Sequence, residues 1–109
     1  VVSVSGTQLL SDAELIPDVF ALQQNYPNPF NPTTQIRYAL PEQSTVVLMI
    51  YDMLGREVRA LVNDTQDSGY RIALWNGTND HGRPVGAGMY IYTIRANDFY
   101  EVKKMILLK

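Results

Sequence analysis

One loop holds the side chains most suited to chemistry: His81 lies beside Asp80, close to Asn76, Thr78 and Asn79. His81 is the single histidine of the chain, and there is no cysteine. Proton transfer needs a partner within hydrogen-bond reach, and structural zinc sites need several histidine or cysteine ligands. A lone histidine in a polar loop is usually solvated. We therefore expect no catalytic and no zinc site in this loop.

The oxygen-bearing side chains of the same loop raise the question of calcium. Asparagine, threonine and aspartate oxygens gathered around glycines can ligate Ca²⁺. Only Asp80 is a carboxylate, however, and no glutamate follows at the spacing of an EF-hand loop. The eleven acidic residues of the chain are scattered singly, so no carboxylate pair of the glycosidase kind is visible. We interpret the loop as a hydrogen-bonded turn and expect neither a metal, a cofactor nor an enzyme.

Aromatic side chains give a second candidate site. Tyr90 and Tyr92 are two residues apart on an expected strand, so they share one face. With Trp75 and Tyr100 they could form a flat platform for sugar rings. Packing inside the domain is the alternative and the favoured interpretation, because aromatic side chains dominate core energetics.

The C-terminal segment is a third candidate, an apolar stretch between lysines. One interpretation is that the lysines only protect a sheet edge from aggregation. Alternatively, the segment is a signal that a receptor reads by strand addition. We call it the signal strand; it consists of Lys103, Lys104, Met105, Ile106, Leu107, Leu108 and Lys109.

Bulk properties limit the classes of protein. A length of 109 residues predicts one domain, and 46% hydrophobic residues are typical of a globular chain. The net charge of −2 gives no electrostatic footprint for nucleic acid. The chain begins Val-Val-Ser-Val, as a piece of a longer protein would. We expect residues 1–17 to be a linker or edge segment and residues 18–109 to be the domain.

Period-2 hydrophobic patterns predict about seven strands with turns between them and no helix. The clearest pattern runs from Thr33 to Leu40, where Thr34, Ile36 and Tyr38 share one face. Val46–Asp52 is apolar on both faces, as expected of a central strand. The other expected strands are 18–22, 57–62, 70–75, 88–96 and 99–108, with 63–69 as a polar turn. This spacing predicts an all-β fold, an immunoglobulin-like antiparallel β-sandwich, with a small barrel as the alternative.

A proline-rich segment precedes the clearest strand. Three of the six prolines of the chain fall within it, and proline biases the residue before it towards an extended backbone. Two aromatic residues within it favour a packed segment over a plain linker. We call it the plug and expect its aromatic residues to pack at the edge of the sandwich; it consists of Asn25, Tyr26, Pro27, Asn28, Pro29, Phe30, Asn31 and Pro32.

Several motifs in a fixed order carry a resemblance to a known family. The chain resembles the type A C-terminal sorting domain of the type IX secretion system, and it is also similar to the Ig-like domain of flagellar hook-capping proteins. The match covers roughly residues 20–109. Ala87 and Asn76 stand where the family often has serine and aspartate, and Asn76 weakens the calcium interpretation further. The matching motifs are residues 22–32, 34–38, 50–56, 75–77, 82–85, 88–90 and 104–109.

The resemblance implies a function that periodicity and composition do not. The domain would be the non-catalytic C-terminal module of a larger protein of a Gram-negative bacterium, secreted or held at the cell surface. An outer-membrane translocon would recognise it in the periplasm, chiefly through Lys104–Lys109. A surface peptidase would cut before it, within residues 1–17, and the upstream cargo would be anchored to lipopolysaccharide or released.

Two other functions stay open on the residues alone. A carbohydrate-binding module of a secreted glycosidase requires Tyr90, Tyr92 or Trp75 to be exposed in a row. A structural domain of a flagellar or other assembly would pack against copies of itself.

Overall fold

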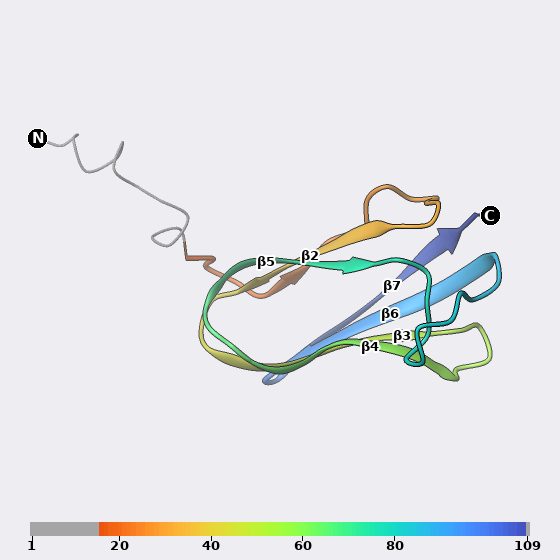
Figure 1. Cartoon of the computed structure of the whole chain (residues 1–109). Coiled ribbons are helices and arrows are strands. Elements are labelled where there is room, and N and C mark those ends of the chain that lie inside the picture. Colours follow the sequence, from red (N-terminus) through yellow and green to blue (C-terminus); the bar gives the residue numbers. More distant parts are fainter. Residues whose placement is uncertain (1–15, 109) are drawn as a thin grey trace, which may run out of the picture.

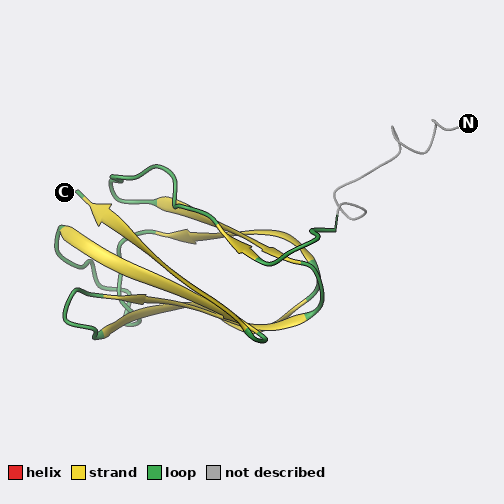
Figure 2. Ribbon diagram, turned by 180° about the vertical axis from the view of Figure 1, so that it is seen from behind, coloured by secondary structure: helices red, strands yellow, loops and turns green. Residues whose placement is uncertain are grey.

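The computed structural model describes residues 16–108, which form two antiparallel β-sheets packed face to face (Figure 1). The smaller sheet has the strand order β1-β2-β5 and the larger one β4-β3-β6-β7. Figure 2 shows both layers from behind, without a helix among the described residues. Within residues 16–108 there is accordingly no helix long and apolar enough to span a membrane. The expected all-β sandwich of seven strands is confirmed. The strands are β1 (Ala21–Leu22), β2 (Thr34–Leu40), β3 (Ser44–Tyr51), β4 (Glu57–Gln66), β5 (Gly69–Trp75), β6 (Gly88–Ala96) and β7 (Phe99–Leu107).

The hydrophobic pattern of each strand sets the face that it buries. In β2 the predicted inward residues are buried, from Thr34 to Leu40 at every second position. β3 lies between β4 and β6, and its second face is only partly exposed, as its apolar pattern predicts. Side chains from the inner faces of both sheets form one core, as in other β-sandwiches.

One expected turn is wrong. Residues 63–69 were expected to form a polar turn after a short strand, but β4 continues to Gln66. The backbone of Asn63, Asp64 and Thr65 pairs with β3, opposite Val47, Val46 and Thr45. Their polarity reflects exposed side chains on an edge strand, which alternation of hydrophobic residues does not detect.

Candidate recognition edge at the C-terminal strand

The plug is seated on the sandwich by Phe30. This ring is only 1% exposed, and its centroid lies 5.7 Å from that of Trp75. Trp75 in turn meets Tyr90 edge to face at 5.3 Å, a geometry that aromatic pairs favour. The expectation that Phe30 packs at the sandwich edge is confirmed.

Tyr26, the other expected aromatic anchor, does not pack. Its side chain is 78% exposed, so this part of the expectation is wrong. The segment is held there by its backbone, because Tyr26 and Gln35 exchange two N–H···O bonds of 2.9 Å. A backbone bond of this kind leaves no signal in residue type.

A glycine lets the plug approach the loop after β5. Gly77 has φ +76°, and a Cβ at this position would lie 3.3 Å from the carbonyl oxygen of Pro32. Both the left-handed backbone and the close contact favour glycine. Trp75 also binds this loop, through a 2.8 Å bond from its indole N–H to the Thr78 carbonyl.

A buried polar network fixes the start of the plug. The Tyr92 hydroxyl accepts a 2.7 Å bond from the Asn25 backbone N–H and donates a 2.7 Å bond to the Gln23 carbonyl. The Asn25 side chain donates to the Thr34 hydroxyl at 3.0 Å and to the Pro27 carbonyl at 3.2 Å. Burial raises the pKa of Tyr92 to about 12, although the hydrogen bond from Asn25 acts in the opposite direction. Tyr92 therefore stays a neutral hydroxyl that can both donate and accept.

The plug lies along the outer edge of β7. Phe30 pairs in parallel with β7, its N–H donating to the Ile106 carbonyl at 3.0 Å and its carbonyl accepting from the Leu108 N–H at 2.8 Å. The side-chain oxygen of Asn28 accepts from the Ile106 N–H at 2.9 Å. Gln24, just before the plug, donates to the Lys104 carbonyl at 2.7 Å. Two segments nearly eighty residues apart in the sequence thus form one edge.

The other half of this edge stays open. The backbone N–H and C=O groups of a strand point to the same side at every second residue. Those of Tyr100 and Val102 therefore point away from β6, as those of Ile106 do. Among the described residues no backbone group pairs with them on that side. Arg95 lies over the Tyr100 ring at 4.8 Å. A strand could add directly at Tyr100 and Val102, whereas addition at Ile106 would require the plug to leave.

The signal strand is divided by its alternation. Met105 and Leu107 are buried in the core, whereas Lys104, Ile106 and Leu108 face outward. Lys103 is partly buried and forms a 3.1 Å ion pair with Glu101. Lys109 lies outside the described residues, as do residues 1–15 of the expected linker. In the folded domain only the outward side chains are available to a receptor.

The aromatic residues proposed for sugar binding do not form a platform. Trp75, Tyr90 and Tyr92 are all buried, with exposed fractions of 1%, 7% and 0%. The Tyr90 hydroxyl is committed to the Gly86 carbonyl at 2.6 Å. The carbohydrate-binding hypothesis required exposed rings at these positions, so it is wrong for this site, and the core interpretation holds.

The loop around His81 is a hydrogen-bonded turn, as expected. The Asn79 side-chain oxygen accepts from the His81 and Arg83 backbone N–H groups at 2.9 and 3.0 Å. Asp80 accepts from the Ala60 N–H at 3.0 Å, which ties the loop to β4. The His81 side chain itself is exposed. Of the loop oxygens weighed as calcium ligands, those of Asn79 and Asp80 accept from backbone N–H groups, and those of Asn76 and Thr78 accept from side chains.

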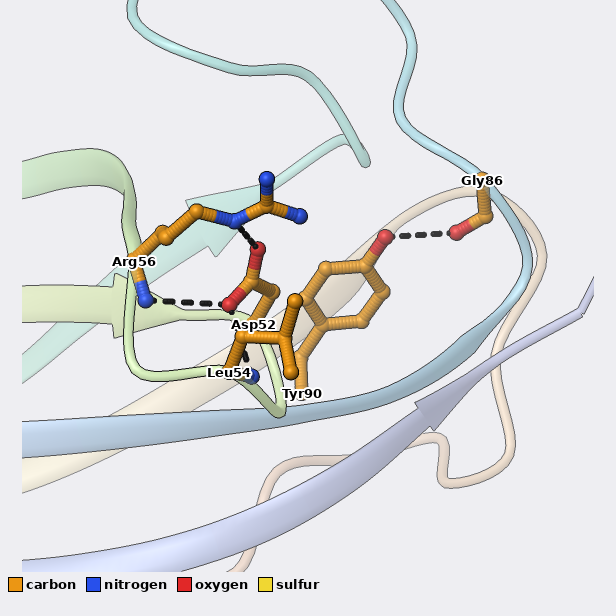
Figure 3. A network of polar contacts seen from close by, with 5 residues as sticks. All are labelled: Asp52, Leu54, Arg56, Gly86 and Tyr90. Atoms are coloured by element: carbon orange, nitrogen blue, oxygen red, sulfur yellow. Dashed lines mark hydrogen bonds and ion pairs between the residues drawn. The ribbon is translucent and has the colours of Figure 1, made fainter.

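The same turn occurs a second time, and it was not predicted from the sequence. Asp52 accepts from the Leu54 and Arg56 N–H groups at 2.9 and 3.0 Å, just as Asn79 does in its loop (Figure 3). The signal is visible in the sequence as Asp-x-x-Gly-Arg at 52–56 and Asn-x-x-Gly-Arg at 79–83. Hydrogen bonds from the Arg56 and Leu54 backbone, with the Arg56 guanidinium at 2.8 Å, lower the pKa of Asp52. Figure 3 also shows Tyr90 beside this turn; burial and the Asp52 charge raise the pKa of Tyr90.

Comparison with known proteins gives the family. The model of the FlgD Ig-like domain matches residues 30–98. The chain belongs to this family. The match confirms an Ig-like domain, and it spans the sandwich from Phe30 in the plug to the β6–β7 turn. A comparison with curated proteins found no match.

Two solved structures from Porphyromonas gingivalis resemble this FlgD-type Ig-like domain. One is dimeric latent PorU, with 25% identity, a TM-score of 0.67 and 86% of this chain covered. The other is PorZ, described as an essential surface component of the type IX secretion system, with 20% identity, a TM-score of 0.56 and 79% covered. The chain spans only about a tenth of each, 10% of PorU and 11% of PorZ. The PorZ likeness shows the fold alone.

Proposed function

We propose that this Ig-like domain is a non-catalytic sorting and cell-attachment domain of the type IX secretion system. In this role it directs a larger protein, of which it is the C-terminal module, through the outer membrane of a Gram-negative bacterium. The partner is the outer-membrane translocon, which reads the domain from the periplasm.

The observation that carries the proposal is the edge formed by the plug and β7. The sorting-domain resemblance includes the plug, its most diagnostic motif, and the C-terminal residues 104–109, through which it implies recognition. They are hydrogen-bonded to each other through Phe30, Asn28, Ile106 and Leu108. Because both motifs lie on one surface, a single receptor can contact them together. A segment of PorZ, described as a surface component of this secretion system, has the same fold.

The chemistry of this edge suits recognition rather than catalysis. Within the described part of the chain it offers backbone donors and acceptors at Tyr100 and Val102, apolar side chains at Ile106 and Leu108, and an exposed cation at Lys104. Main-chain bonds of an added strand give affinity, and alternate side chains give specificity. The lysine favours a partner surface that carries carboxylates.

The later steps of the pathway are part of the same proposal. A surface peptidase would cut the chain before the domain, within residues 1–17. The cargo upstream would then be attached to lipopolysaccharide or released, so the mature protein would be secreted or held at the cell surface.

A reporter fusion tests the function. Residues 18–109 are fused to the C-terminus of a periplasmic reporter in a host that has the secretion system, and surface exposure is measured by protease shaving of intact cells. We expect the reporter at the surface, and in the periplasm of the same host without its translocon. Retention in the periplasm of the complete host would contradict the proposal.

A further inference from the structure

Among the described residues, β5 is the longest strand whose outer edge is unpaired along its whole length. The plug covers half of the β7 edge, and β1 has only two residues. The first part of the β4 edge is bonded by the loop at Asp80, whose backbone N–H donates to the Val58 carbonyl at 2.9 Å and whose carboxylate accepts from the Ala60 N–H. β5 pairs with β2 alone, and Figure 1 shows it at the border of its layer. Among the described residues nothing pairs with the other side of β5.

The direction of the backbone groups on β5 follows from its neighbour. Gln35 and Arg37 bond towards Tyr26 and Gln23, on the side of β2 away from β5. Because the direction alternates along a strand, the intervening β2 residues bond to β5. Their partners in the register are Arg71, Ala73 and Trp75. The N–H and C=O groups of Tyr70, Ile72 and Leu74 therefore point outward.

The side chains at these three positions are apolar and exposed. Tyr70 is 69% exposed, Ile72 56% and Leu74 60%. Edge strands are usually protected by lysine, proline or a bulge, and β5 has no lysine, no proline and no register shift against β2. Its one charged side chain, Arg71, is bonded within the chain to the Asp67 carbonyl at 2.9 Å. Unprotected apolar edges of this kind favour pairing with another strand.

We propose that β5 is the interface with a second copy of this chain. The two β5 strands pair antiparallel about a two-fold axis at Ile72, which joins the two smaller sheets into one. Tyr70 then lies opposite Leu74 of the second copy, and Ile72 lies opposite its own equivalent.

The sequence of β5 is complementary to itself in this register. A two-fold interface needs the same patch on both partners. Each outward residue meets an apolar partner, and Arg71 meets Ala73 of the second copy, so like charges are not opposed. A groove of about 510 Å³, lined by β5 and by Leu61 and Val62 of β4, leaves room for the inward side chains of an added strand.

Cysteine cross-linking of the full chain tests the register. The chain has no cysteine, so Ile72→Cys introduces a single thiol at the proposed axis. Opposed residues that exchange both hydrogen bonds have Cα atoms about 5.5 Å apart, within the range of disulfides. We expect Ile72→Cys to form a disulfide-linked dimer in oxidised glutathione at least tenfold faster than Leu54→Cys. Leu54 is the matched control, an apolar residue 78% exposed in a turn. Equal rates would overturn the proposal.

Sedimentation equilibrium of the full chain, without cysteine, gives a second readout. We expect a concentration-dependent dimer for the natural sequence and for Leu54→Lys. Ile72→Lys should weaken the dimer at least tenfold. At concentrations low enough for the natural chain to be monomeric, both should unfold at the same temperature, because the Ile72 side chain is exposed. A monomer at all concentrations would overturn self-pairing and leave the β5 edge to a strand of another protein.

Discussion

Phe30 is the residue on which the plug depends most. Its ring fills a place against Trp75 in the core. We expect Phe30→Ala to lower the free energy of unfolding by about 3 kcal/mol, as removal of a buried phenylalanine does. The exposed Tyr26 is the control in the same segment, and Tyr26→Ala should change stability by less than about 0.5 kcal/mol. Urea unfolding measures both, and a loss below about 0.5 kcal/mol for Phe30→Ala would show that the plug is only a linker.

Tyr92 links the plug to the larger sheet through its hydroxyl. Tyr92→Phe leaves the Asn25 N–H and the Gln23 carbonyl without this partner. We expect a loss of about 1–3 kcal/mol, the cost of leaving a buried donor or acceptor unpaired. Urea unfolding at neutral pH measures it, with Tyr100→Phe as the control, because Tyr100 is exposed. Equal stability of the two variants would contradict the role of the hydroxyl.

The same hydroxyl makes stability depend on alkaline pH. The pKa of Tyr92 is raised to about 12 in the folded chain, against about 10 in an unfolded one. The unfolded chain loses this proton first, so the contribution of Tyr92 is complete below about pH 10 and falls as the pH rises to about 12. Burial also raises the pKa of Tyr38 and Tyr90. We expect a shallower alkaline fall for Tyr92→Phe in urea unfolding; parallel curves would contradict the shift.

At the scale of elements, the plug and β7 act as one unit. The Asn28 side chain gives the Ile106 N–H a partner that an edge strand would otherwise lack. We expect Asn28→Ala to speed amide exchange at Ile106 about five- to tenfold, the effect of losing roughly one hydrogen bond. Asn28→Asp keeps the acceptor and should restore protection. Exchange measured by NMR should already be fast at Tyr100 and Val102, and equal protection along β7 would contradict the open half-edge.

The elements themselves are mostly predictable from the sequence, but their edges are not. Alternation finds β2 and β6 because one face of each is buried. The end of β4 is missed because Asn63 to Gln66 pair through backbone with largely exposed side chains. The contact of Phe30 with β7 is missed for a related reason. Backbone pairing between segments distant in the sequence leaves no periodic signal in either segment.

At the scale of the molecule, the edge strands of the two sheets differ in how they are covered. One border joins the plug to β7, and the other leaves β5 open. The sequence indicates neither border, because the family resemblance marks the plug and residues 104–109 as motifs without placing them side by side. The aromatic residues show why residue type alone does not predict a binding site. Trp75 and Tyr92 are of the types that bind sugar rings, yet they form part of the core. Burial depends on which strands face each other, and this is a property of the whole fold.

The central claim is that the outward face of β7 directs sorting, and reporter delivery tests it most directly. The fusion described above carries Lys104→Glu with Leu108→Glu, two exposed changes that leave the core residues Met105 and Leu107 intact. Leu54→Glu, on an exposed turn, is the control. We predict that the β7 variant stays in the periplasm, folded, while the control reaches the surface like the natural sequence. Equal surface delivery of the β7 variant and the control would contradict the claim.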